Sequence, residues 1–159
     1  MRFLLLTISI VLILSKPVFA EEFERLADDI SLHYNIDRLS PGGIKFVTSL
    51  MKPIVFFKGI RKFKIAAFEN KDPNIETSLE ELESVVSQSL GSEWKPFLGA
   101  RSNRKNSASV IFLQTSRKNM RILIATIEKN TTALIHMKLS KRAIIKFMDN
   151  PEAMVGEGE

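Results

Sequence analysis

The sequence predicts an α+β fold built mainly on an antiparallel sheet: one strand plus a four-strand meander, covered by about four helices. Residues 94–138 contain four short apolar segments separated by polar turns at intervals of about ten residues, which is typical of a meander. Apolar residues lie on both faces of its middle segments, so both faces need cover from helices or a partner. Segments with helical periodicity flank this block.

Residues 1–20 have the features of a secretory signal peptide. Arg2 precedes an apolar run at 3–14, and Pro17 and the small residue Ala20 follow it. The run is short for a transmembrane helix, so we expect cleavage after Ala20 and export to the periplasm or the exterior. An uncleaved anchor is the alternative.

The remaining chain is expected to form one domain at 21–149 with a disordered acidic tail at 150–159. Apolar residues at helical spacing predict a first helix over 22–34, and turn residues predict a loop over 35–43. A second helix is expected over 44–57, which Pro53 kinks or ends.

Alternating residues predict a strand over 60–68. Ser78-Leu-Glu-Glu81 forms a capping box at the start of a third helix, which Gly91 is placed to end. The apolar stripe of that helix consists of Leu79, Leu82, Val85, Val86 and Leu90.

The meander is expected to have strands at 95–101, 108–115, 120–128 and 131–138, with turns at 102–107, 116–119 and 129–130. Ser140 can cap a last helix through Met148, and Pro151 ends it.

Charge is distributed unevenly along the chain. Residues 21–93 carry 9 Lys or Arg and 13 Asp or Glu, whereas residues 94–148 carry 12 Lys or Arg and only Glu128. Such asymmetry is informative about partners. In a meander the first and third turns lie at one end of the sheet and the second at the other. The candidate anion or partner surface is therefore Arg101, Arg104, Lys105 and Lys129 at one end, and Arg117, Lys118 and Arg121 at the other.

The alternative interpretation is that these cations protect turns and edges from aggregation and are neutralised by the acidic helices. Nucleic acid is not expected as a partner, because no aromatic residues alternate with the cations and the chain is predicted to be exported.

The sequence shows no catalytic constellation. It has no cysteine, which excludes thiol catalysis, cysteine-bound zinc and iron–sulfur clusters. His33 and His136 lack a companion at metal-binding spacing, so we expect structural histidines. The glutamates at 80, 81 and 83 are explained by capping and solvation, and Trp94 by core or sheet-edge packing.

Four segments together resemble an uncharacterised family of exported bacterial proteins catalogued as domain of unknown function 4252. They are GIRKFKI at 59–65, WKPF at 94–97, VIFL at 110–113 and MRILI at 120–124. The resemblance spans roughly 22–148 and implies an α+β envelope protein with no assigned activity.

We therefore expect a non-enzymatic envelope or secreted protein that acts through protein–protein contact, with no cofactor and no metal. The alternative is a binder of anionic surfaces, such as lipid headgroups or acidic glycans, through the basic turns. Peripheral membrane contact and homo-oligomer formation are both compatible with this pattern. An enzyme with a site assembled from scattered residues ranks third.

Overall fold

The computed structural model describes residues 18–40, 60–71, 78–104 and 106–149. The predicted signal segment lies almost wholly outside these residues, as do the predicted helix 44–57 and the predicted acidic tail 150–159.

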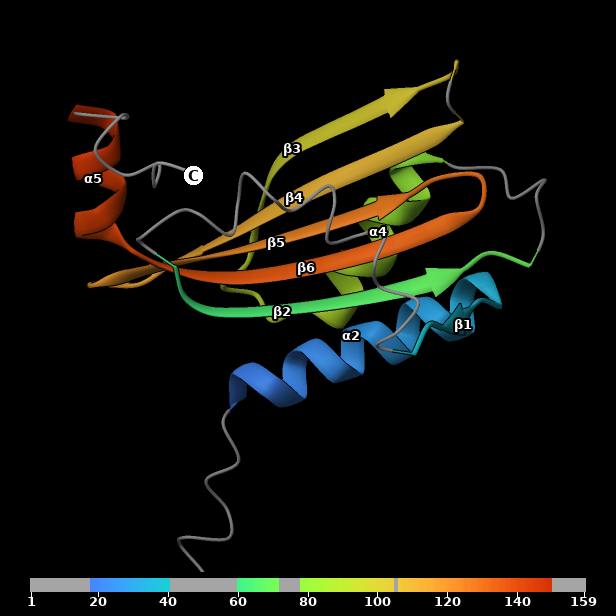
Figure 1. The fold of residues 1–159 in the computed structure, drawn as a ribbon, viewed down its shortest axis with the longest axis horizontal. Helices are drawn as coiled ribbons and strands as arrows, with labels where there is room; N and C mark the ends of the chain where they lie inside the picture. The colour runs from blue at the N-terminus through green and yellow to red at the C-terminus, as the bar shows by residue number, and fades with distance from the viewer. Residues whose placement is uncertain (1–17, 41–59, 72–77, 105, 150–159) are drawn as a thin grey trace, which may run out of the picture.

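The six described strands form one antiparallel sheet in the order β1-β2-β6-β5-β4-β3 (Figure 1). Their bounds are β1 Asp37–Arg38, β2 Ile60–Glu69, β3 Lys95–Ser102, β4 Ser107–Thr115, β5 Asn119–Ile127 and β6 Thr131–Ser140. The described helices are α2 Val18–Tyr34, α4 Leu79–Ser89 and α5 Lys141–Asp149. The predicted fold class is therefore wrong: the described residues form a sheet of six strands rather than five, and three helices rather than about four.

The strand missing from the prediction is β1. It lies inside the segment 35–43, which turn chemistry predicts to be a loop, and consists of Asp37 and Arg38 alone. These residues pair with Glu69 and Phe68 of β2. Two residues are too few to show an alternating pattern, so only the pairing with β2 defines the strand.

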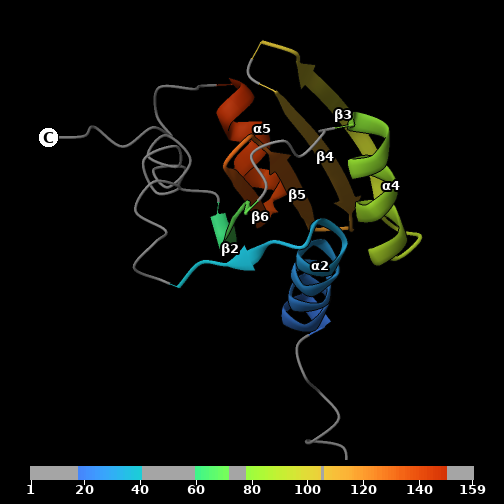
Figure 2. The same ribbon diagram turned by 90° about the vertical axis from the view of Figure 1, so that its right-hand side faces the viewer.

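Helices α2 and α4 lie on the same side of the sheet, as Figure 2 shows from the side. Leu26 and Ile30 of α2 and Leu82 and Val86 of α4 are fully buried between the helices and the sheet. Arg25 of α2 also donates to the carbonyl of Ser89, 2.9 Å away at the end of α4. The apolar stripes expected for both helices are confirmed, and they pack against buried residues of the sheet such as Phe112 and Leu123.

Helix α2 begins at Val18, four residues earlier than predicted, and ends before Asn35, whose φ is 50°. Asparagine tolerates this left-handed conformation better than most residues. Glu24 of α2 accepts from Arg38 of β1 at 2.6 Å and from Lys64 of β2 at 3.0 Å. These ion pairs hold the edge of the sheet against the helix.

The Ser78 half of the capping box predicted at the N-terminus of α4 is confirmed, since the Ser78 hydroxyl accepts from the backbone N–H of Glu81 at 3.3 Å. The Glu81 carboxylate instead lies 2.8 Å from Nε2 of His33. The C-terminus of α4 differs from the prediction. The helix ends at Ser89, and Leu90 leaves it in an extended conformation with φ −94° and ψ 155°. The described glycines all have negative φ, so Gly91 does not form the expected left-handed cap.

Two tight turns connect the last three strands at the predicted positions. Glu128 and Thr131 exchange backbone hydrogen bonds across the β5–β6 turn. The backbone N–H of Ser116 donates to the carbonyl of Asn119 across the β4–β5 turn at 2.9 Å, and the Ser116 hydroxyl donates to the same carbonyl. Two-residue turns of this kind fix the register of the strands they join.

The sheet face opposite α2 and α4 is also apolar, as the sequence predicts. It carries half-buried isoleucines on four neighbouring strands: Ile65, Ile111, Ile122, Ile124 and Ile135. Helix α5 stands at one end of the sheet, away from α2 and α4 (Figure 1).

Candidate anion-binding cleft

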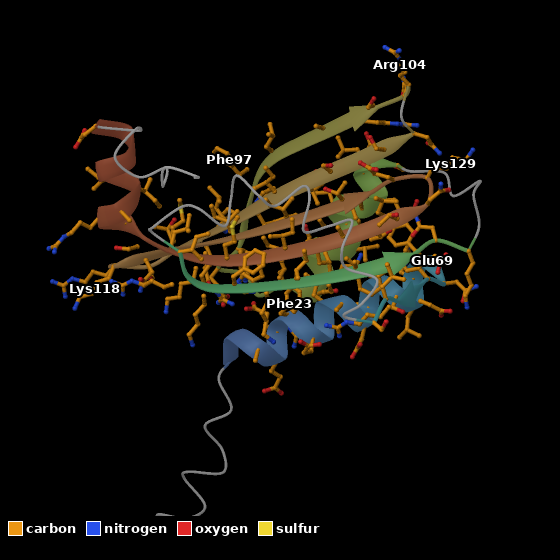
Figure 3. All side chains as sticks on the ribbon, in the orientation of Figure 1. Phe23, Glu69, Phe97, Arg104, Lys118 and Lys129 are labelled. Atoms are coloured by element: carbon orange, nitrogen blue, oxygen red, sulfur yellow. The ribbon has the colours of Figure 1, made fainter. Side chains whose placement is uncertain are left out.

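The basic turns of the meander lie at opposite ends of the sheet. Arg104 and Lys129 are at the end shared by the β3–β4 and β5–β6 turns, and Lys118 is at the other end (Figure 3). Arg101 and Arg117 are exposed at these same respective ends. Lys105 lies outside the described residues. The two ends differ strongly in what surrounds the cations.

At the β4–β5 end, a cavity of about 530 Å³ is lined by seven of the described residues, of which five are cationic and none is acidic. We call this cavity the basic cleft, and its lining residues are Arg61, Arg117, Lys118, Ser140, Lys141, Arg142 and Ile145. Its lining residues come from the start of β2, the β4–β5 turn, the end of β6 and the first residues of α5. Cations gathered without acids repel one another, so this arrangement favours the binding of an anion.

Backbone contacts explain why these three segments meet. The N–H of Lys141 donates to the carbonyl of Lys118 at 3.2 Å, which holds the first turn of α5 beside the β4–β5 turn. Ser140, at the end of β6, pairs with Asn119 of β5. The β2–β6 register shifts between Ile60 and Lys62, so Arg61 lies at an irregularity in the strand next to β6.

Only two of the five described cations of the basic cleft, Arg117 and Lys118, were predicted from the sequence. Arg61 lies at the start of β2 and reaches the cleft because β2 pairs with β6. Lys141 and Arg142 lie in the first turn of α5, which is held beside the β4–β5 turn. The Lys141-Arg142 pair next to Ser140 was a local signal, because basic residues at the start of a helix are unfavourable for the helix dipole.

At the opposite end, Arg101 and Lys129 lie close to acids. Arg101 is close enough to Glu80 to help lower the pKa of that exposed carboxyl, after larger contributions from a backbone N–H and the Ser78 hydroxyl. Lys129 directly follows Glu128, and Glu69 of β2 pairs with Thr131 beyond the same turn. This end fits the alternative interpretation of the basic turns, in which acidic residues neutralise them.

Arg121 does not belong to the exposed surface at the β4–β5 turn. It points from β5 to the side of the sheet that α2 covers, and its guanidinium forms an ion pair with Glu22. The side chains of Arg121 and Glu22 are only 16% and 10% exposed. The residue is therefore occupied by an internal contact and is not part of the basic cleft.

Around this ion pair lies a buried polar network. Trp94 Nε1 donates to Glu22 Oε1 at 2.7 Å, and Arg121 Nη1 donates to Gln114 Oε1 at 2.5 Å. The Arg121 guanidinium also lies over the Trp94 ring, 4.9 Å from its centroid. The network joins the start of α2 to the residue before β3 and to strands β4 and β5. Trp94 is buried in the core, as the sequence predicts.

His136 completes the network from β6. Arg121 Nε donates to His136 Nε2 at 3.3 Å, which requires that nitrogen to carry no proton. Burial lowers the pKa of His136 to about 3, and the nearby charges of Arg121 and Lys64 contribute further. A neutral imidazole that stacks on Phe23 and lies edge-on to Trp94 has a structural role, in line with the prediction.

His33 lies in a second cavity, of about 650 Å³, between α2 and α4. Its Nε2 is 2.8 Å from Glu81 Oε1, and both side chains are more than two-fifths exposed. Ser84 lines the same cavity, but its hydroxyl accepts from Gln88 rather than from His33. The geometry does not assemble a nucleophile with a base.

Within the described residues, no group of three or more histidine, aspartate or glutamate side chains could hold a metal ion. None of the described helices is long and apolar enough to cross a membrane.

Comparison of the chain with models of protein families, with curated proteins and with solved structures gives no match. The resemblance to the uncharacterised exported family therefore stays a prediction from the sequence.

Proposed function

We propose that the protein binds anionic groups in the basic cleft and that it acts without catalysing a reaction. The observation that supports this proposal is the set of five cations that surround one cavity whose described lining contains no acid. Guanidinium and ammonium groups bind phosphate and carboxylate through short charge-assisted hydrogen bonds. Two of the residues, Arg117 and Lys118, belong to the surface that the sequence predicts.

The lining residues of the basic cleft offer different kinds of hydrogen-bond donor to an anion. Three arginines provide planar donors suited to bidentate contacts with an anion, whereas two lysines provide adaptable point charges. The hydroxyl of Ser140 adds a donor at the start of α5, where the positive end of the helix dipole also favours negative charge. A ligand with several negative charges would use more of these groups than a single phosphate.

The predicted export of the chain would bring the basic cleft close to the anions of a bacterial envelope. Bacterial envelopes present phosphate groups on lipids and carboxylates on glycans, and both kinds of anion fit the chemistry of the cleft.

The test measures the affinity of the purified, exported protein for tripolyphosphate by isothermal titration calorimetry. Arg117→Glu/Lys118→Glu should weaken binding by about tenfold or more, because hydrogen bonds to charged groups are lost and like charges are introduced. The matched control, Arg101→Glu/Arg104→Glu, makes the same charge change at the acid-flanked end and should leave the affinity unchanged. Equal losses in both variants, or no binding by the parent protein, would contradict the proposal.

A second candidate function is contact with another protein through β3, in line with the interaction module expected from the sequence. This strand lies at the end of the strand order, and among the described strands it pairs only with β4. Phe97 and Leu98, at the irregularity in its register, are 67% and 55% exposed. Phenylalanine is enriched in protein interfaces, and adjacent exposed apolar side chains mark candidate contact surfaces.

This candidate is tested by in-cell crosslinking of the tagged, exported protein. Phe97→Ser/Leu98→Ser should lose a specific crosslinked product that the parent protein forms. Leu32→Ser is the control, because Leu32 is 81% exposed on α2 and is not part of β3. A product that both variants retain would exclude β3 as the contact surface.

A further inference from the structure

One residue of the basic cleft is unsuited to a soluble anion. Ile145 lines the cleft among the cations, and 59% of its surface is exposed. In a helix, residues three or four apart share a face, so Ile145 lies on the same side of α5 as Lys141 and Arg142. A free phosphate or polyphosphate would contact the cations and gain nothing from the isoleucine.

A phospholipid surface accommodates both kinds of group. Cations attract the negative surface of an anionic membrane and lie at the level of its headgroups, whereas apolar side chains of interfacial helices enter the boundary with the acyl chains. This combination of charges around an exposed apolar residue is the pattern that the basic cleft presents.

The position of the cleft permits contact with a flat surface. Helix α5 and Lys118 lie together at one extremity of the molecule, away from α2 and α4 (Figure 3). Arg117, Lys118 and Arg142 are exposed there, and Lys141 is half-buried. A membrane could therefore approach this end without contacting the helices that cover the core.

We propose that the basic cleft binds the surface of an anionic phospholipid membrane, with its cations at the headgroups and Ile145 inserted at the acyl boundary. The inference rests on the proposed anion-binding function and names its ligand as a phospholipid surface.

The experiment compares flotation of the purified, exported protein with mixed phosphatidylglycerol–phosphatidylcholine vesicles and with pure phosphatidylcholine vesicles. The parent protein should bind only the mixed vesicles, and less at high salt because salt screens exposed charges. Each cation near an anionic surface strengthens binding about fivefold, so Arg117→Glu/Lys118→Glu should weaken vesicle binding at least about 25-fold.

The Ile145→Ser variant distinguishes binding to a membrane from binding to a soluble anion. It should weaken binding to the mixed vesicles about fivefold, because the apolar contact is lost, and leave the affinity for tripolyphosphate unchanged. Leu32→Ser removes an exposed leucine from α2 and should bind vesicles as the parent protein does.

Four outcomes would overturn the inference. If the protein binds tripolyphosphate but not the mixed vesicles, the membrane ligand is wrong and the proposed anion-binding function stands. If it binds neither, both proposals fail. If Ile145→Ser binds vesicles as tightly as the parent protein, insertion of Ile145 is wrong. Equal binding to pure phosphatidylcholine vesicles would show that attraction to anionic headgroups is not what holds the protein.

Discussion

Replacement of Arg121 by methionine should destabilise the fold strongly, because Arg121 forms a buried ion pair with Glu22. Methionine keeps much of the length and apolar volume of the side chain but removes its charge and donors. Glu22 would keep the hydrogen bond from Trp94, 2.7 Å away, as its described partner. A carboxylate in this position would be largely without compensation for its lost hydration.

The expected magnitude follows from the burial of the pair. Loss of one partner from a buried ion pair typically costs about 3–5 kcal/mol. Because Glu22 keeps the hydrogen bond from Trp94, the expected loss of unfolding free energy for Arg121→Met lies near the lower end of this range, at about 3 kcal/mol. In the double variant Glu22→Gln/Arg121→Met no buried charge stays unpaired, so its loss should be smaller than the sum of the two single losses by about 1–2 kcal/mol.

The assay is urea denaturation followed by circular dichroism and by the emission of Trp94, the only tryptophan in the chain. Arg117→Met is the control, since Arg117 is exposed in the β4–β5 turn and its replacement should change stability by less than about 0.5 kcal/mol. A loss of less than about 1 kcal/mol of unfolding free energy in Arg121→Met would refute a strong stabilising role of the ion pair. The same role would be refuted if the loss in the double variant equalled the sum of the losses in the two single variants.

Two further predictions concern stability. The pKa of His136 is lowered to about 3 in the folded protein from an ordinary value of 6.5, so the unfolded chain takes up this proton first as the pH falls. The free energy of unfolding should therefore decline from about pH 6.5 towards pH 3, and His136→Phe should flatten that slope in urea titrations at several pH values; an unchanged slope would contradict this. Ser78→Ala removes the hydroxyl that caps α4 and should cost about 1 kcal/mol, whereas Ser84→Ala, within the same helix, should cost clearly less. Equal effects of the two substitutions would show that the cap contributes little.

The elements with strong local patterns were predictable from the sequence. The meander strands, the two-residue turns and the capped start of α4 each depend on residues that are neighbours along the chain. Alternation, helical spacing and turn chemistry therefore located them to within a few residues. The end of α4 was predicted wrongly, because Leu90 leaves the helix in an extended conformation and the left-handed glycine cap is not used.

The candidate site was predictable only in part, because its residues come from separate segments. Arg117 and Lys118 were identified by their charge in a turn, whereas Arg61 and Arg142 reach the same cavity through strand pairing and the placement of α5. Arg121 was predicted to lie at the surface because it follows a basic turn. Side chains alternate between the two faces of β5, however, and that of Arg121 lies on the face that α2 covers.

The sequence by itself determined where charge accumulates, which segments alternate and which helix faces are apolar, since these are properties of short stretches of chain. The tertiary structure alone decided which cations stay exposed. Arg121 is neutralised by Glu22, 99 positions away, whereas Arg61, Lys141 and Arg142 are brought beside the β4–β5 turn. The reason is physical: burial and ion pairing depend on distances in space, and those are set only when β2 pairs with β6 and α2 covers the sheet.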